Sequence, residues 1–370
     1  MSKIPDRLIT YCTNIHPGEA WDTVFAALQQ HIPAVKCAVS PGQAFPIGLR
    51  LSNRAAAELT VEKSMIFREW LAQNDCFVPT INGFPYGSFH GDSIKYQVYL
   101  PDWRSSERTA YTIRLANLLA NLLPENVTGT ISTVPIGFKS NIGSDDMEEI
   151  RRQLESALCH LRGIFEKTGK HIILSLEPEP GCMLETVDDV SRFFELFTFP
   201  ESLSRHIGIC YDCCHQAVEF EEPAASWNHV VSKGIRIAKV QISSAIRIAG
   251  KDAGKLKLLD EPGYLHQVVV RGRNGELDRY SDIPEAFANH GMQPGEEWRS
   301  HFHVPIYLEE ACTMGTTRQF LIDLLLRLPG DVLLEVETYT WDVLPPELRS
   351  GSVTDSIIRE ILWLKEQLHA

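Results

Sequence analysis

Hydrophobic positions along the chain follow two patterns that alternate from the N-terminus to the C-terminus. Short runs of β-branched and aliphatic residues are each followed by a helix-like segment or by a stretch long enough to contain one. This alternation predicts eight strands, over residues 7–14, 47–52, 76–83, 128–137, 171–180, 207–215, 236–245 and 331–341.

The segment over 144–169 shows the helical half of the repeat most clearly. Ser144 is a good N-cap residue, acidic residues fill the first turn, and Gly169 predicts the end of the helix. The apolar stripe of this helix consists of Met147, Ile150, Leu154, Leu158 and Leu161. A last helix over 354–368 is predicted to close the chain.

Alternating strands and helices, with strands of the fully buried type, indicate a parallel sheet covered by helices. Eight such units favour a (β/α)8 TIM barrel over a doubly wound sheet, so we predict a single α/β domain over residues 1–370. No G-x-G-x-x-G motif follows the first strand, which removes the main signal of a dinucleotide-binding fold. Residues 246–316 are long and irregular, and we predict an insertion after the seventh strand, at the carboxyl-terminal face of the barrel.

The charge balance limits the class of partner. The chain has 370 residues, 44% of them hydrophobic, and a formal net charge of −13 at pH 7. Nucleic-acid binding relies on clustered Lys and Arg, so we expect a small molecule rather than a nucleic acid as the partner. No stretch approaches the ~20 apolar residues of a membrane span, and the N-terminus lacks a secretory signal. We expect a cytoplasmic protein, and the sequence leaves homo-oligomerisation open.

The cysteines support this compartment. There are nine, an odd number, and no pair has zinc-ribbon spacing, which favours a reducing environment. Cys210 and Cys213 form a C-x-x-C pair, but no helical pattern resumes directly after it, which argues against a thioredoxin-like redox motif. Cys213 and Cys214 are therefore predicted to be packing residues.

Polar side chains recur at the carboxyl ends of the late strands, where the active sites of such barrels lie. A carboxylate beside an apolar run is unfavourable unless it is paired, hydrogen-bonded or bound to a cation. The strand ends supply Glu177, Asp212, Gln241, Glu335 and Glu337. Oxygen ligands of this kind suit Mg²⁺ or Mn²⁺, or Zn²⁺, and such an ion would help a carboxylate to move a proton beside a carbonyl group.

Each of these residues also has a structural interpretation. Glu177 and Glu179 could pair with cations at the barrel rim, and Asp212 could cap a following turn. Gln241 alone could be a hydrogen-bonding filler, and His215 alone is more often structural than catalytic. The functional interpretation depends on the set rather than on any one member.

Four segments, "SLEPEP", "YDCCH", "KVQISSA" and "LEVETYTW", resemble the metal-binding strand ends of xylose-isomerase-like barrels. The resemblance implies a metal set of Glu177, Asp212, Gln241 and Glu337, with glutamine on strand seven as in hydroxypyruvate isomerases. It further implies that His215, in a D-x-x-H turn, and Arg247 contact the substrate, and that Glu177 and Glu337 act as acid and base.

A closer resemblance covers nearly the whole chain. Its segments are "TYCTNIHPGEAWDTVF", "VYLPDWRSSER", "LEPEPGC", "CYDCCHQAVEFE" and "WRSHFHVPI". Together they are similar to the metabolite-traffic barrel proteins of the ebo gene cluster (EboE). This resemblance implies a role in handling a secondary-metabolite precursor and does not define a reaction.

Further residues are predicted on the same face of the barrel as substrate contacts. His301 and His303 alternate, so both point the same way if they lie in a strand, and they either join the metal shell or stabilise a loop over the barrel mouth. The other predicted substrate contacts are His16, Asn82, His90, Lys95 and Trp341.

Three functions remain open at this point. The first is a metal-dependent isomerase or epimerase acting on a small hydroxy-carbonyl compound. The second is a non-catalytic protein that binds a metabolite on the same scaffold. The third is a phosphodiesterase like endonuclease IV, which the acidic charge and Gln241 on strand seven both disfavour.

Overall fold

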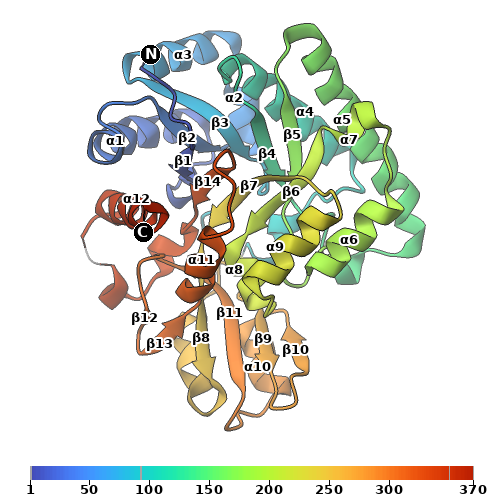
Figure 1. Cartoon of the computed structure of the whole chain (residues 1–370), viewed down its shortest axis with the longest axis vertical. Helices are drawn as coiled ribbons and strands as arrows, with labels where there is room; N and C mark the ends of the chain where they lie inside the picture. The colour runs from blue at the N-terminus through green and yellow to red at the C-terminus, as the bar shows by residue number, and fades with distance from the viewer. Residues whose placement is uncertain (1, 92–93, 350, 370) are drawn as a thin grey trace.

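The predicted barrel is present, and its eight strands run parallel. In the computed structural model, which describes residues 2–91, 94–349 and 351–369, they form one sheet in the order β1-β14-β7-β6-β5-β4-β3-β2 (Figure 1). The strands are β1 (Ile9–Tyr11), β2 (Phe45–Arg50), β3 (Cys76–Asn82), β4 (Gly129–Thr133), β5 (Ile172–Leu176), β6 (Ile207–Asp212), β7 (Ile237–Ile242) and β14 (Leu333–Val336). Each strand overlaps the range predicted for it.

The sheet closes into a barrel where β1 meets β2. A parallel bridge joins Cys12 to Gly48 at this seam. A Cβ atom on Gly48 would lie 2.0 Å from Glu335 Oε1 and 2.6 Å from the carbonyl oxygen of Tyr11. Only glycine permits so close an approach of backbone and side chain, so Gly48 both closes the barrel and leaves room for Glu335.

Helices cover the outside of the barrel, as the helical spacing predicted (Figure 1). They are α1 (Trp21–Val39), α2 (Asn53–Glu58), α3 (Val61–Gln73), α4 (Ser106–Leu122), α5 (Met147–Thr168), α6 (Val187–Leu196), α7 (Glu201–Ser204), α8 (Cys213–Val218), α9 (Pro223–Ser232), α11 (Arg318–Leu325) and α12 (Val353–His369). Within the described ranges, none of the helices has the length and apolar character needed to cross a membrane.

The two ends of α5 test the predicted boundaries. Gly169 follows the helix in the left-handed conformation, with a φ of 71°, as predicted. Ser144 is not the N-cap: it begins a short 3-10 turn, and α5 starts only at Met147. The carboxylate of Asp146 accepts a hydrogen bond from the Gly143 N–H at 2.8 Å, so this acid caps the turn instead of the serine hydroxyl.

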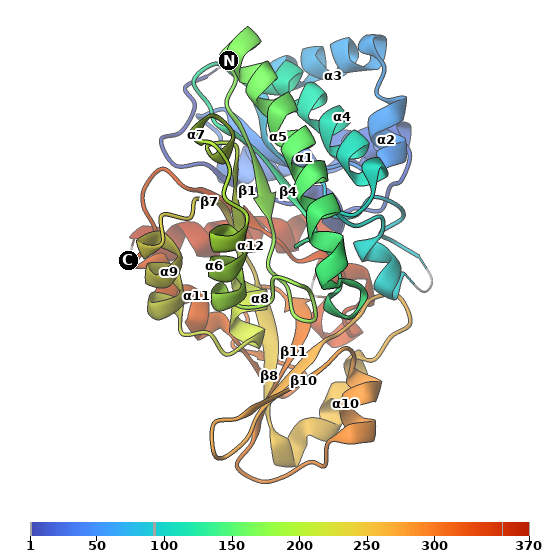
Figure 2. The same ribbon diagram turned by 90° about the vertical axis from the view of Figure 1, so that its right-hand side faces the viewer.

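The chain between β7 and α11 forms a second sheet, which is antiparallel and confirms the predicted insertion. Its strands lie in the order β10-β9-β11-β8-β13-β12. They are β8 (Ser244–Ala249), β9 (Val268–Arg271), β10 (Leu277–Tyr280), β11 (Glu297–Val304), β12 (Glu310–Ala311) and β13 (Met314–Thr316), and α10 (Ile283–Asn289) accompanies them. Figure 2 shows β8, β10 and β11 projecting below the barrel, away from the N-terminus.

Polar side chains occupy much of the barrel interior. Lys239 of β7 and Glu335 of β14 form an ion pair in which both side chains are completely buried. Because alternate residues of a strand point to the same side, Gln241 and Glu337 follow them toward the carboxyl ends of these two strands. The interior of such a barrel is usually filled by branched apolar side chains. Here polar side chains extend from the barrel centre to the candidate site.

The C-x-x-C segment differs from the sequence interpretation in one respect. A helix, α8, does follow β6 directly, and it starts at Cys213. Cys210, Cys213 and Cys214 are nonetheless completely buried, and burial raises the pKa of each thiol well above its usual value. A reactive thiolate requires a lowered pKa, so the prediction that Cys213 and Cys214 are packing residues is confirmed by their burial.

Candidate metal centre

A pocket lies at the carboxyl ends of the barrel strands. Its polar lining includes Asn82, Glu177, Glu179, His215, His301 and Glu337. The rest of its lining is mostly aromatic or aliphatic, and includes Phe84, Phe89, Ile94 and Leu265. A concave, largely apolar site with a few converging polar groups is the usual form of a small-molecule site.

Three carboxylates from three different strands converge at this pocket. Glu177 directly follows β5, Asp212 ends β6 and Glu337 directly follows β14. One oxygen of each lies within 4.8 Å of the other two, and all three side chains are buried. The parallel barrel brings them together because it places the carboxyl ends of all its strands at one face.

The hydrogen bonds of these carboxylates leave oxygen atoms free. Asp212 Oδ1 accepts from the His215 N–H at 3.0 Å and from Ser243 Oγ at 2.7 Å, while Asp212 Oδ2 has no hydrogen-bond partner among the described residues. Glu177 Oε2 also has none. Asp212 is therefore a helix N-cap, as the structural interpretation expected, and still presents one unpaired oxygen.

Glu337 is fixed by two amides that sequence analysis treated differently. Its Oε1 accepts from Asn14 Nδ2 at 2.8 Å and from Asn82 Nδ2 at 3.2 Å. Asn82 was a predicted substrate contact, whereas Asn14 was not predicted to take part. Asn14 lies in the short turn after β1, where no local pattern distinguishes it from an ordinary loop residue.

Gln241 lies beside the carboxylates in the barrel wall. It is paired in register with Asp212 of β6 on one side and with Glu335 of β14 on the other. Its side chain is completely buried, and neither its Oε1 nor its Nε2 has a hydrogen-bond partner. An unpaired buried amide is unfavourable, so a ligand for its oxygen would stabilise this arrangement.

Burial and mutual repulsion shift the pKa values of the three buried acids. Burial and the nearby Asp212 raise the pKa of Glu177 to about 8, although His215 opposes the shift. Burial, together with Glu177 and Asp212, raises the pKa of Glu337 well above its usual value. Burial also acts to raise the pKa of Asp212, but His215 and His303 outweigh it and hold that pKa low. A bound divalent cation would relieve the repulsion, so the residues present fit a metal ion.

Three histidines form a cluster next to the carboxylates. His215 lies in α8, and His301 and His303 lie in β11 of the second sheet. The Nε2 atom of His301 is 3.1 Å from Nε2 of His215 and 3.2 Å from Nε2 of His303. Burial lowers the pKa of His301 well below its usual value and that of His303 to about 4.

A β-bulge positions the two histidines of β11. Ser300 pairs with Ile246 of β8, and the next pair, Val304 with Ser244, lies four residues further along β11 but only two along β8. The irregular stretch of β11 therefore covers residues 301–303, which include both histidines. Bulges re-aim side chains in this way, and here they turn both imidazoles toward the barrel mouth.

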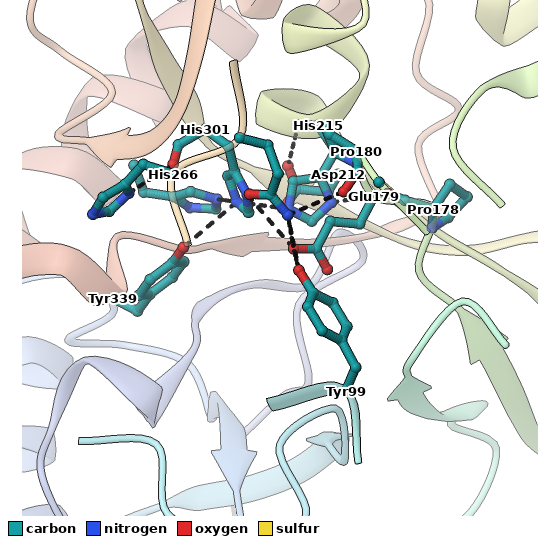
Figure 3. Close-up of polar contacts among 12 residues, drawn as sticks. Tyr99, Pro178, Glu179, Pro180, Asp212, His215, His266, His301 and Tyr339 are labelled. Carbon is teal, nitrogen blue, oxygen red and sulfur yellow. Dashed lines mark hydrogen bonds and ion pairs between the residues drawn. The ribbon is translucent and has the colours of Figure 1, made fainter. Parts of the chain in front are cut away.

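Glu179 contributes to this site although the sequence favoured a rim ion pair for it. Its Oε1 accepts a hydrogen bond from the Tyr99 hydroxyl at 2.7 Å and from Gln267 Nε2 at 3.3 Å, and its side chain is buried (Figure 3). Tyr99 and Gln267 come from a short 3-10 turn and from the edge of β9. Sequence analysis missed both, because each lies in an irregular segment far from Glu179 along the chain.

Lys95 was predicted near the substrate, and it does line the pocket. It forms an ion pair with Asp282 Oδ2 at 2.5 Å, which links the segment after β3 to the second sheet. The positive charge at this edge of the pocket is therefore neutralised by the protein itself.

Three of the predicted substrate contacts, His16, His90 and Trp341, do not line the pocket. His16 is buried and stacks on His31, with ring centroids 4.2 Å apart, and Trp341 lies in the same outer region. His90 is near the pocket, but both of its ring nitrogens are buried without a partner, and it does not line the cavity.

Arg247, predicted to orient the substrate, is the clearest correction. It lies in β8, where Ile246 and Ile248 are buried and Arg247 is exposed. The barrel strand β7 ends at Ile242, and the chain then enters the second sheet with a new alternation of faces. Arg247 therefore lies on the solvent side of that sheet, although it follows Gln241 closely along the chain.

Neither a protein-family model nor a curated protein sequence matches this chain. Solved structures do match it at low identity. D-allulose 3-epimerase from Methylomonas sp. in complex with D-allulose has a TM-score of 0.53 and 11% identity, over 99% of each chain. The IOLI protein with a bound zinc atom has a TM-score of 0.52 and 12% identity, over 98% of each chain.

A third match is a xylose isomerase-like TIM barrel protein from Mycobacterium smegmatis in complex with magnesium. Its TM-score is 0.51 at 13% identity, over 98% of this chain and 96% of that one. At such identities the likeness establishes the fold alone. The chain has the xylose-isomerase-like TIM-barrel fold.

Proposed function

We propose that this protein binds a divalent metal ion and catalyses an isomerase- or epimerase-type proton transfer on a small hydroxy-carbonyl compound. The observation that carries the proposal is the convergence of Glu177, Asp212 and Glu337 beside a pocket, with one unpaired oxygen on Glu177 and one on Asp212. The ions bound by two of the similar structures, zinc and magnesium, agree with this donor set. Manganese fits the same oxygen ligands.

Glu177, Asp212, Gln241 and Glu337 would hold the metal. When bound, such an ion polarises a carbonyl group and stabilises the negative charge that develops when the neighbouring carbon loses a proton. Glu177 and Glu337 approach the pocket from β5 and β14, which are separated in the sheet by β6 and β7. They are the proposed base and acid, because each lines the pocket from a different side.

The apolar part of the lining bears on the substrate. Phe89 packs against Tyr264 and Tyr339, with ring centroids 5.4 and 5.2 Å away, and all three line the pocket. Such a wall excludes water and favours a substrate with an apolar portion next to its hydroxy-carbonyl group. The resemblance to the ebo-cluster proteins supports a substrate from a secondary-metabolite pathway.

Metal analysis tests the first half of the proposal. Protein stripped of metal is dialysed against Mn²⁺ or Mg²⁺, which prefer oxygen ligands, and the bound ion is measured for the wild type, Asp212→Ala and Asp323→Ala. Asp323 is an exposed acid of α11 and serves as the matched control. We expect Asp212→Ala alone to lose the ion, and retention of the ion by Asp212→Ala would contradict the site.

Solvent exchange tests the chemistry. The metal-loaded protein is incubated in D₂O with a panel of 2-hydroxy ketones, free ketoses and apolar-substituted analogues included. Deuterium at the carbon beside the carbonyl is followed by NMR, and we expect incorporation to depend on both Glu177 and Glu337. Tight binding of a panel member without any exchange would favour the second candidate, a metabolite-binding protein, for which the apolar lining is the supporting observation.

A further inference from the structure

The three clustered histidines lie beside the carboxylates but have no role in the proposed metal set. Their side chains are at most 3% exposed, and each comes from an element that does not supply a carboxylate ligand, except that His215 follows Asp212. We infer that His215, His301 and His303 form a second cation site, one that takes a divalent transition metal such as Zn²⁺ through three imidazole nitrogens. The inference goes beyond the proposed function and does not depend on the reaction.

The hydrogen bonds of the outer ring nitrogens fix the tautomer of all three rings. Nδ1 of His215 lies 2.9 Å from the carbonyl oxygen of Pro178, and Nδ1 of His303 lies 2.8 Å from the carbonyl oxygen of Glu337. A carbonyl oxygen can only accept, so both Nδ1 atoms must carry the hydrogen. The lone pair of each neutral ring is therefore on Nε2.

His301 follows the same rule through a side chain. Its Nδ1 lies 2.7 Å from Gln267 Oε1. The orientation of that amide is set by its other end, because Gln267 Nε2 donates to Tyr99 Oη at 2.8 Å and to the carbonyl oxygen of Pro180 at 3.0 Å. Gln267 therefore presents an acceptor to His301, whose lone pair is also on Nε2.

The Nε2 atom of His301 consequently faces the Nε2 atoms of both His215 and His303 inside the protein. A single extra proton would satisfy only one of the two contacts, because His301 Nε2 is close to both His215 and His303. The nearest hydroxyl, that of Tyr339, is 3.5 Å from His301 Nε2 (Figure 3). A cation at the centre of the three atoms would satisfy all of them at once.

The spacing agrees with a metal ion. Zinc binds imidazole nitrogen at about 2.0–2.1 Å, so a tetrahedral ion keeps two such nitrogens roughly 3.3 Å apart. The two measured Nε2 separations are 3.1 and 3.2 Å. One ring nitrogen of His215 and one of His303 also lie within 4.8 Å of each other and of an oxygen of Asp212, so a metal ion would have to draw these two imidazoles closer together to bind all three.

The donor set distinguishes this site from its neighbour. Imidazole favours zinc, copper, iron or nickel, whereas a set of carboxylates favours magnesium or manganese. Each imidazole is held through Nδ1 by a fixed acceptor, which is how metal-ligating histidines are usually oriented. His215 and His301 line the pocket, so a fourth coordination position would face it. Asp212 has an oxygen within 4.8 Å of Glu177 and Glu337, and also one within 4.8 Å of His215 and His303. His215 would then bind the ion instead of the substrate.

Cobalt binding provides a test that does not require a substrate. Metal-free protein is titrated with Co²⁺ while the visible absorption is recorded, because tetrahedral Co²⁺ absorbs much more strongly than octahedral Co²⁺. We expect the wild type to bind one ion at each site and to develop the intense band. His301→Ala and His303→Ala should each lose the band, and the affinity of the second Co²⁺ ion should fall by about 100-fold or more.

Three further variants separate the possible outcomes. Glu177→Ala should lose only the carboxylate site and keep the band, whereas His206→Gln, which removes a buried imidazole near the start of β6, should behave like the wild type. Gln267→Leu leaves all three imidazoles in place but removes the acceptor for His301, and should weaken the second binding step by about 10–100-fold. Circular dichroism and thermal melting identify any variant that does not fold.

The inference is overturned if His301→Ala, His303→Ala and Gln267→Leu bind Co²⁺ as the wild type does. In that case, binding lost only in Glu177→Ala would leave the proposed function intact. Absence of binding in every protein, the wild type included, would overturn both proposals.

Discussion

Buried carboxylates occur at two levels of the barrel, and their charged partners differ. Deep in the interior, Glu335 is paired with Lys239, and both are completely buried. At the mouth, Glu177, Asp212 and Glu337 lie together with no Lys or Arg among their hydrogen-bond partners. Among the described residues, a lysine pairs with the deep acid, whereas no lysine or arginine forms an ion pair with the three acids at the pocket. This difference supports the proposal that a metal ion binds at the mouth.

The largest expected effect comes from breaking the deep pair. Lys239→Met leaves Glu335 buried without a partner, and we expect it to lower the free energy of unfolding by about 3–5 kcal/mol. Denaturant titration measures this loss. The double variant Lys239→Met/Glu335→Met removes both charges and should recover most of the stability, so an equally unstable double variant would contradict a role for the ion pair.

A third kind of buried acid sharpens the comparison. Glu360 of α12 is buried away from the pocket, accepts hydrogen bonds from the Thr338 hydroxyl and the Ile306 N–H, and has a pKa raised by burial from 4.5 to about 7. The folded state binds this proton more tightly than the unfolded state. Its contribution is therefore fully present below about pH 4.5 and is lost as the pH rises through 7.

We expect this loss to reach up to about 3 kcal/mol above pH 8 and to be absent in Glu360→Gln. Chemical denaturation between pH 5 and pH 9 measures it, in the presence of a chelator so that metal binding does not vary. Glu366→Gln, an exposed position on the same helix, is the control. A Glu360→Gln profile as steep as that of the wild type would show that another group is responsible.

Metal binding to the three acids at the mouth should raise the free energy of unfolding without involving the Lys239–Glu335 pair. At a free ion concentration 100-fold above the dissociation constant, binding to the folded state adds about 2.7 kcal/mol. Thermal melting with and without Mn²⁺, which prefers the oxygen ligands of the carboxylate site, measures this gain. We expect Asp212→Ala to lose it, and Lys36→Gln, which changes a charge outside the barrel, to retain it.

The smallest effect is expected at the pocket edge. The Lys95–Asp282 pair is partly exposed, with side chains 26% and 13% accessible, so Lys95→Gln should change the free energy of unfolding by less than about 1 kcal/mol. Equilibrium denaturation of Lys95→Gln and Asp282→Asn checks this. A loss as large as that of Lys239→Met would mean that partial exposure does not distinguish the two ion pairs.

Sequence reasoning succeeded where the local pattern of hydrophobic and polar residues defines an element. The strand ranges and the alternation predicted the barrel, and the barrel rule then selected Glu177, Asp212 and Glu337, which the structure brings within 4.8 Å. It was wrong for Arg247, because the side that a residue faces depends on where one sheet ends and the next begins. It missed Asn14, Tyr99 and Gln267, which reach the site from turns and from a sheet edge.

The sequence by itself determined the barrel and the three acids, because both follow from local periodicity and from the ends of strands. Only the tertiary structure decided the position of the histidines. His301 and His303 reach His215 through a bulge in a separate antiparallel sheet, 86 residues along the chain from His215 to His301. No local pattern encodes such a meeting, because it depends on how two sheets pack and on which carbonyl oxygens remain free to orient each ring.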